Sequence, residues 1–130
     1  MDLKAQMGQF LAPEFSLPQL AERLYQAETD PDRVVMRQWI YGEEETCREL
    51  SRAQVNKRIK VVAARLQQVA DPGTRVAILA GNSPEYVFGF LGALYAGMVP
   101  IPLYDPNEPG HADHLEAVFG DCEPPIVVTN

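Results

Sequence analysis

The sequence predicts an α/β fold: a mainly parallel, doubly wound sheet flanked by helices, with a small β-hairpin ahead of it. Three short runs rich in branched apolar residues carry this prediction, because they are typical of strands buried on both faces: Arg75–Ala80, Val99–Tyr104 and Ile126–Thr129. Helical signals separate these runs, and strand, helix, strand with short joints is typical of parallel crossovers. With 130 residues, 46% of them hydrophobic, the chain supports one core and not two.

The first third of the chain is predicted to hold an arm, a helix and the hairpin. Residues 1–15 lack a clear apolar period and are interpreted as a lead-in arm, so the folded unit begins at residue 16. Ser16 is a suitable cap for a helix to about residue 27. Two strands, Val34–Ile40 and Glu43–Thr46, flank a short turn and form the antiparallel hairpin.

Three further helices are predicted. Thr46 and Glu49 have the spacing of a capping box, which starts a long amphipathic helix ending near Ala70. Asn82 or Ser83 caps the next helix, which has a proline in its opening turn and ends near residue 97. After a loop over residues 105–110, the last helix runs from residue 111 to about residue 121.

Charge is divided unevenly along the chain, whose net charge is −7. All eleven Lys and Arg lie between Lys4 and Arg75, whereas the charged residues after Arg75 are all acidic: Glu85, Asp105, Glu108, Asp113, Glu116, Asp121 and Glu123. Nucleic acids are held mainly through Lys and Arg, so no nucleic-acid partner is expected. The longest uncharged run, residues 86–104, contains two prolines and is interpreted as a buried helix and strand, not as a membrane span.

Cysteine spacing and the N-terminus bear on the compartment. Cys47 and Cys122 show neither metal-ligand nor redox spacing, and the first residues lack the pattern of a secretory signal. A reducing, cytoplasmic compartment is therefore expected.

Two motifs are candidates for ligand contacts. The Ala80–Pro84 loop follows a predicted strand and opens a helix, but its single glycine matches neither a dinucleotide fingerprint nor a Walker loop. An ordinary helix start is favoured over a ligand-contacting loop. His111 and His114, with Asp113 and Glu116 nearby, would reach one metal ion from a helix. No third ligand is identifiable, so surface or loop-packing histidines are favoured and no metal is assigned.

Two helical surfaces allow a structural and a functional interpretation. The long helix carries bases that either solvate its outer face, the favoured interpretation, or dock an acidic partner such as a carrier protein: Arg48, Arg52, Lys57, Arg58, Lys60 and Arg65. The next helix has a surface of small residues, which favours tight packing over a wall that leaves room for a ligand: Gly89, Gly92, Ala93, Ala96 and Gly97. No spacing in the chain predicts a nucleophile or a carboxylate pair.

The second half of the chain resembles the N-terminal portion of the adenylate-forming superfamily, and within it the fatty acyl-AMP ligases of the mycobacterial and polyketide-loading type. The most specific segments are Phe90–Gly97 (FLGALYAG), Pro100–Pro106 (PIPLYDP), Glu108–His111 (EPGH) and Ile126–Thr129 (IVVT). Upstream, Thr46–Leu50 (TCREL) also fits, so the resemblance covers roughly residues 17–130.

The resemblance implies an enzyme that uses ATP and magnesium to activate a fatty acid to acyl-AMP, for transfer to an acyl carrier protein or polyketide synthase. The family's phosphate loop, adenine-contacting motif, ribose-binding Asp and catalytic Lys lie beyond the matched stretch, and no lysine follows Lys60. No catalytic, cofactor-binding or metal residue is therefore assigned. Residues 16–130 are expected to be an incomplete N-terminal subdomain that is inactive alone. An acyl-CoA synthetase and a non-catalytic binding module remain the alternatives.

Overall fold

The computed structural model describes residue 19, residues 30–103 and residues 110–129. In chain order the elements are β1 (Val34–Ile40), β2 (Thr46–Ser51), α3 (Arg52–Val69), β3 (Arg75–Leu79), α4 (Pro84–Tyr95), β4 (Val99–Pro102), α5 (His111–Cys122) and β5 (Ile126–Thr129). The predicted arm, the helix starting at Ser16 and residues 104–109 of the predicted loop lie outside the described residues. None of the helices in the described ranges is long and apolar enough to cross a membrane.

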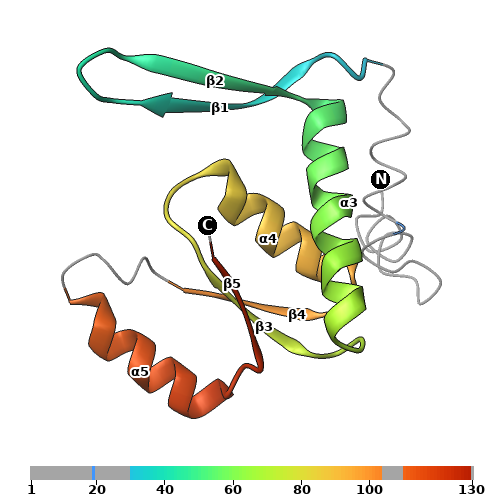
Figure 1. The fold of residues 1–130 in the computed structure, drawn as a ribbon, viewed down its shortest axis with the longest axis vertical. Coiled ribbons are helices and arrows are strands. Elements are labelled where there is room, and N and C mark those ends of the chain that lie inside the picture. Colours follow the sequence, from blue (N-terminus) through green and yellow to red (C-terminus); the bar gives the residue numbers. More distant parts are fainter. Residues whose placement is uncertain (1–18, 20–29, 104–109, 130) are drawn as a thin grey trace, which may run out of the picture.

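The three segments predicted as buried strands form one parallel sheet in the order β4-β3-β5 (Figure 1). In the centre of the sheet, Ala77 of β3 lies opposite Ile101 of β4 and Val127 of β5. At the two ends of β4, the Val99 N–H donates to the carbonyl of Thr74 (2.9 Å) and the Leu103 N–H donates to the carbonyl of Ile78 (3.1 Å). The prediction of a parallel sheet is confirmed, but burial on both faces holds only for β3, because Val99 of β4 is 49% exposed and Val127 of β5 is 43% exposed.

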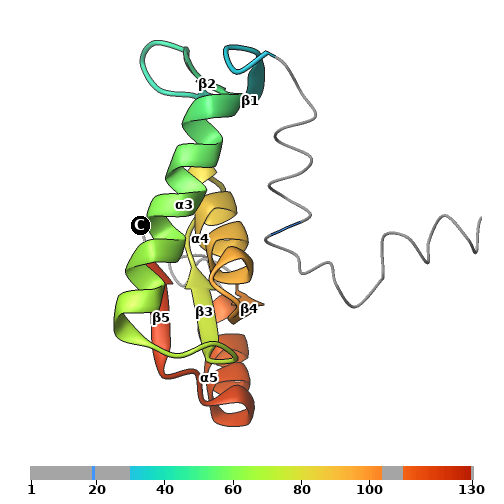
Figure 2. The same cartoon turned by 90° about the vertical axis from the view of Figure 1, so that its right-hand side faces the viewer.

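Helices cover both faces of the sheet. Successive side chains of β3 point to opposite faces, so they pack against different helices. Val76 and Ile78, both fully buried, pack with α3 and α4 on one face. Ala77 packs on the other face with Leu103 and with Leu115 of α5. Figure 1 shows this layering, with the sheet between the α3–α4 pair and α5, and in Figure 2 α5 lies below α4. The doubly wound arrangement predicted from the sequence is confirmed.

The small residues of α4 permit close packing on two sides. A Cβ added to Gly92 would lie 2.6 Å from Cγ1 of Val62 on α3, and one added to Gly89 would lie 3.2 Å from Cγ1 of Val128 on β5. Ala93 and Ala96 are buried in the same core. The tight-packing interpretation is confirmed at these positions, and no room is left there for a ligand.

The predicted start of the long helix is wrong. Thr46 and Glu49 do not cap a helix; they belong to β2, which begins at Thr46, where the predicted strand ends, and runs to Ser51. The capping box is formed five residues later, where Ser51 Oγ accepts from the Gln54 N–H (3.2 Å) and Gln54 Oε1 accepts from the Ser51 N–H (2.9 Å). Pairing with β1 overrides the local capping pattern, because it holds the backbone of this segment extended beside the neighbouring strand.

Candidate functional site

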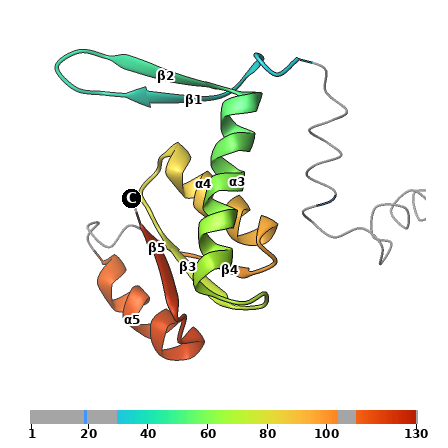
Figure 3. The same ribbon diagram turned by 45° about the vertical axis from the view of Figure 1, so that its right-hand side comes forward.

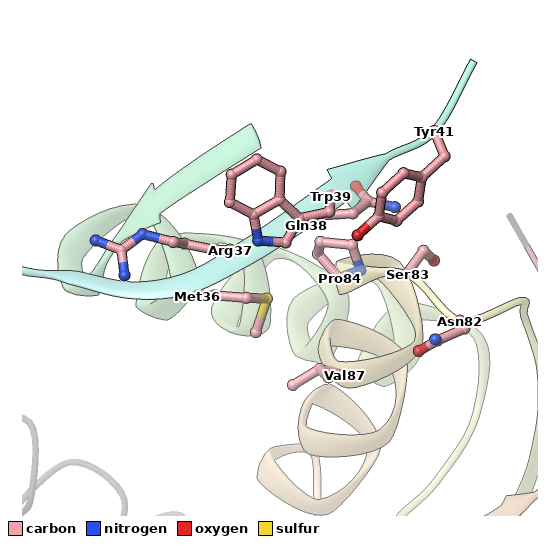
Figure 4. A pocket seen from close by; sticks show the side chains of 9 residues that line it. All are labelled: Met36, Arg37, Gln38, Trp39, Tyr41, Asn82, Ser83, Pro84 and Val87. Carbon is pink, nitrogen blue, oxygen red and sulfur yellow. The ribbon is translucent and has the colours of Figure 1, made fainter. Parts of the chain in front are cut away.

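A pocket of about 360 Å³ lies between strand β1 and the turn that joins β3 to α4 (Figure 4). Its lining comes from two segments that are more than forty residues apart in the sequence: Met36, Arg37, Gln38, Trp39 and Tyr41 from the hairpin, and Asn82, Ser83, Pro84 and Val87 from the turn and α4. The turn follows the carboxyl end of the central strand, which is where ligand sites form in open parallel sheets. We therefore treat this pocket as the candidate site.

The turn that forms one wall is held by its own backbone. Ser83 is the N-cap of α4 in extended conformation, and Pro84 occupies the first turn, where its missing N–H costs nothing. The Ser83 hydroxyl does not cap the helix; it donates to the carbonyl of Gly81 (3.4 Å). The Ser83 carbonyl accepts from the Tyr86 N–H (3.1 Å). The wall is thus a fixed helix start beside the exposed Asn82.

The hairpin forms the opposite wall, and successive side chains of β1 point to opposite faces of the strand. Met36 and Gln38 are half-buried, whereas Trp39 is 55% exposed and Tyr41 is 79% exposed. Figure 4 shows the Tyr41 phenol directed toward the start of α4, with Trp39 on the outer side of β1. The aromatic ring that faces the start of α4 is therefore that of Tyr41.

Two ion pairs set the geometry and charge of the hairpin. Arg48 Nη1 on β2 donates to Glu85 Oε1 in the first turn of α4 (2.8 Å), and this contact joins the hairpin to the helix start beside the pocket. The hydrogen bond from Arg48 holds the pKa of Glu85 below its ordinary value, although partial burial of the carboxyl opposes this. Arg37, the cation in the pocket lining, is paired with Glu49 on the neighbouring strand (3.0 Å).

The chemistry of the lining is that of binding. Aromatic rings, a thioether, a proline and two amides offer apolar contacts and hydrogen bonds, and Ser83 adds a hydroxyl. Among the lining residues there is no His, Lys, Cys, Asp or Glu that would serve as an acid, a base or a metal ligand. The pocket therefore has the groups to hold a ligand but lacks those that activate a nucleophile.

The sequence assigns no residue to this site. It favours an ordinary helix start for the Ala80–Pro84 loop over a ligand-contacting loop; the loop does start α4, and its residues 82–84 also line the pocket. The hairpin residues were missed. The available signal was the run Trp39-Ile40-Tyr41, which combines the single tryptophan of the chain with two further large side chains, all exposed in the structure.

The histidine pair is separate from the pocket. His111 and His114 lie at the start of α5, which packs on the face of the sheet opposite α3 and α4, and His114 is exposed. The described residues contain no group of three or more His, Cys, Asp and Glu side chains placed to hold a metal ion.

A doubly wound sheet with a pocket beyond the carboxyl end of its central strand defines an α/β protein with the layout in which open parallel sheets bind ligands. Residues 24–130 match the family described as AMP-binding enzyme, so the chain belongs to that family.

Two relatives within the family are similar to this chain over more than half of its length. The chain is 51% identical over 82 residues to the long-chain-fatty-acid–AMP ligase FadD32 of Mycolicibacterium smegmatis, covering 63% of this chain and 13% of that protein. It is 35% identical over 116 residues to the ligase FadD26 of Mycobacterium tuberculosis, covering 88% of this chain and 20% of the relative. The chain thus spans no more than a fifth of the length of these curated relatives.

Among solved structures, a fatty acid AMP ligase from Legionella pneumophila superposes with a TM-score of 0.72. The alignment covers 93% of this chain and 20% of that one, at 24% identity. This likeness bears out the fold.

Proposed function

We propose that residues 16–130 form the N-terminal subdomain of a fatty acyl-AMP ligase. Such an enzyme joins the carboxylate of a fatty acid to the AMP portion of ATP, releases pyrophosphate and passes the acyl group to a carrier protein. The observation that carries this proposal is the family match over residues 24–130, together with relatives named as long-chain-fatty-acid–AMP ligases. These names favour an AMP ligase over an acyl-CoA synthetase as the activity.

In this proposal the described residues are a scaffold for adenylation and supply no catalytic group. ATP carries its charge on phosphates, which are bound by Lys, Arg, glycine-rich loops or Mg²⁺ held by carboxylates. The candidate pocket has one cation, Arg37, which is already paired with Glu49, and the described ranges contain no cluster of metal ligands. The residues described here therefore do not fit ATP and magnesium, and we derive no reaction step from them.

An exchange assay tests the proposal. In a chimaera, this chain replaces the homologous segment of the Mycolicibacterium smegmatis relative, and fatty-acid-dependent exchange of pyrophosphate into ATP is measured. We expect exchange from the chimaera and background exchange from the 130 residues alone. A well-folded chimaera without exchange would count against a ligase subdomain, and saturable exchange by the chain alone would count against the scaffold role.

A further inference from the structure

The outward side of α3 combines an exposed apolar side chain with a ring of cations. Val61 is 50% exposed, and its neighbours one turn away on the helix surface are Lys57, Arg58 and Arg65, with Ala64 completing the set. All three cations are exposed, and none of them forms an ion pair with another described residue. We call this group, Val61 with Lys57, Arg58 and Arg65, the cationic face.

The charge of α3 sets it apart from the rest of the chain. The helix contains five bases and no acid (RAQVNKRIKVVAARLQQV), although the whole chain has a net charge of −7. Its other side is committed to the core, because Ala63 and Leu66 pack on β3 and Val62 meets Gly92 of α4. Figure 3 shows α3 lying across α4. Because Ala63 and Leu66 are on the core side of this helix, the exposed cationic face points to solvent.

We propose that the cationic face docks an acidic amphipathic helix of the carrier protein that receives the acyl group. The charge of the cationic face and its exposed valine specify such a partner. Carboxylates complement the three exposed cations and steer the encounter, and an apolar side chain on the partner helix covers Val61. The proposal rests on the proposed function, because it assigns a place on this chain to the acceptor of the same enzyme.

Binding of this chain to a purified acidic acyl carrier protein, measured by isothermal titration calorimetry, tests the proposal. We expect saturable binding that weakens as salt is raised. Lys57→Glu combined with Arg65→Glu should weaken it at least tenfold. Val61→Asp leaves the three cations in place and should weaken it at least fivefold.

Val35→Asp is the matched control. Val35 is 43% exposed on the hairpin, so this change adds the same charge at a similarly exposed valine outside the cationic face, and it should alter the Kd by less than twofold. Urea unfolding of each variant checks that the fold is retained. An equal loss in the two aspartate variants would mean that net charge, and not the cationic face, determines binding, and this would overturn the proposal.

Other occupants give different results. If the wild-type chain fails to bind the carrier protein, the proposal is wrong. It is also wrong if the same variants leave carrier binding intact but abolish binding to phosphatidylglycerol vesicles. The same holds if they leave carrier binding intact but dissociate a dimer of this chain. The ligase activity is tested separately, because pyrophosphate exchange needs no acceptor. If a chimaera that carries the face variants keeps both normal exchange and normal loading of the carrier, only the docking surface is overturned.

Discussion

The sheet with its helices and the hairpin are built on different principles. In the sheet body, the central strand is fully buried at Val76, Ala77 and Ile78, and α4 approaches its neighbours closely enough to require glycine. In the hairpin, β1 has one half-buried face and one exposed face, and an ion pair that is more than one-third exposed at both partners connects the hairpin to α4. The contrast teaches that stability resides in the body, whereas the hairpin supplies an exposed wall of the pocket.

The largest expected effect lies in the body. Ile78→Ala removes a fully buried side chain from the centre of the sheet and should lower the free energy of unfolding by about 2–5 kcal/mol. Trp39→Ala on the hairpin removes a larger side chain but should cost only about 1 kcal/mol or less, because that side chain is 55% exposed. Urea unfolding measures both, and equal costs would break the comparison.

A second test compares the same substitution, glycine to alanine, in two helices. Gly92→Ala places a Cβ against Val62 and should destabilise by about 1–2 kcal/mol, since the overpacking exceeds the gain in helix propensity. Gly120→Ala on α5 meets no atom within 4 Å and should stabilise by about 0.5–1 kcal/mol. Thermal or urea midpoints decide the sign, and stabilisation by both changes would refute the close approach of α3 and α4.

The smallest effect concerns the link between the two regions. Because the pKa of Glu85 is lowered in the folded protein, the ion pair with Arg48 stabilises above the ordinary pKa of 4.5 and ceases to do so as the pH falls through the lowered value. Glu85→Gln should therefore cost about 0.2–1 kcal/mol at neutral pH, since solvent screens this pair. The cost should vanish in acid, and a cost that is independent of pH would show that the charge is not responsible.

The sequence predicted the body better than the hairpin for a physical reason. A strand that is buried on both faces must be apolar along its buried stretch, as residues 76–79 of β3 are, so its composition reveals it. Thr46 and Glu49 satisfy a helix cap in isolation, and only the pairing of Cys47 with Trp39 and of Glu49 with Arg37 across the hairpin makes the segment a strand. A contact between residues distant in sequence decides such a case, and local spacing does not contain it.

The same reason limited the prediction of the site. A strand-to-helix turn has a local signature, so the sequence marks residues 82–84 as a helix start, although it does not make them site residues. Whether Tyr41 lies beside Pro84 depends on where the hairpin rests on the body, and this is set in part by the ion pair between Arg48 and Glu85. The pocket therefore required three-dimensional information.

The prolines of β4 determine on which side the sheet accepts another strand. Because the N–H groups of Val99 and Leu103 point to β3, those of the alternate positions would point away from it, and these positions are Pro100 and Pro102, which have no N–H to donate. The outer edge of β4 thus presents carbonyls without donors and resists strand addition. Self-association through this sheet during unfolding should consequently proceed from the edge of β5, whose residues 126–129 keep their donors.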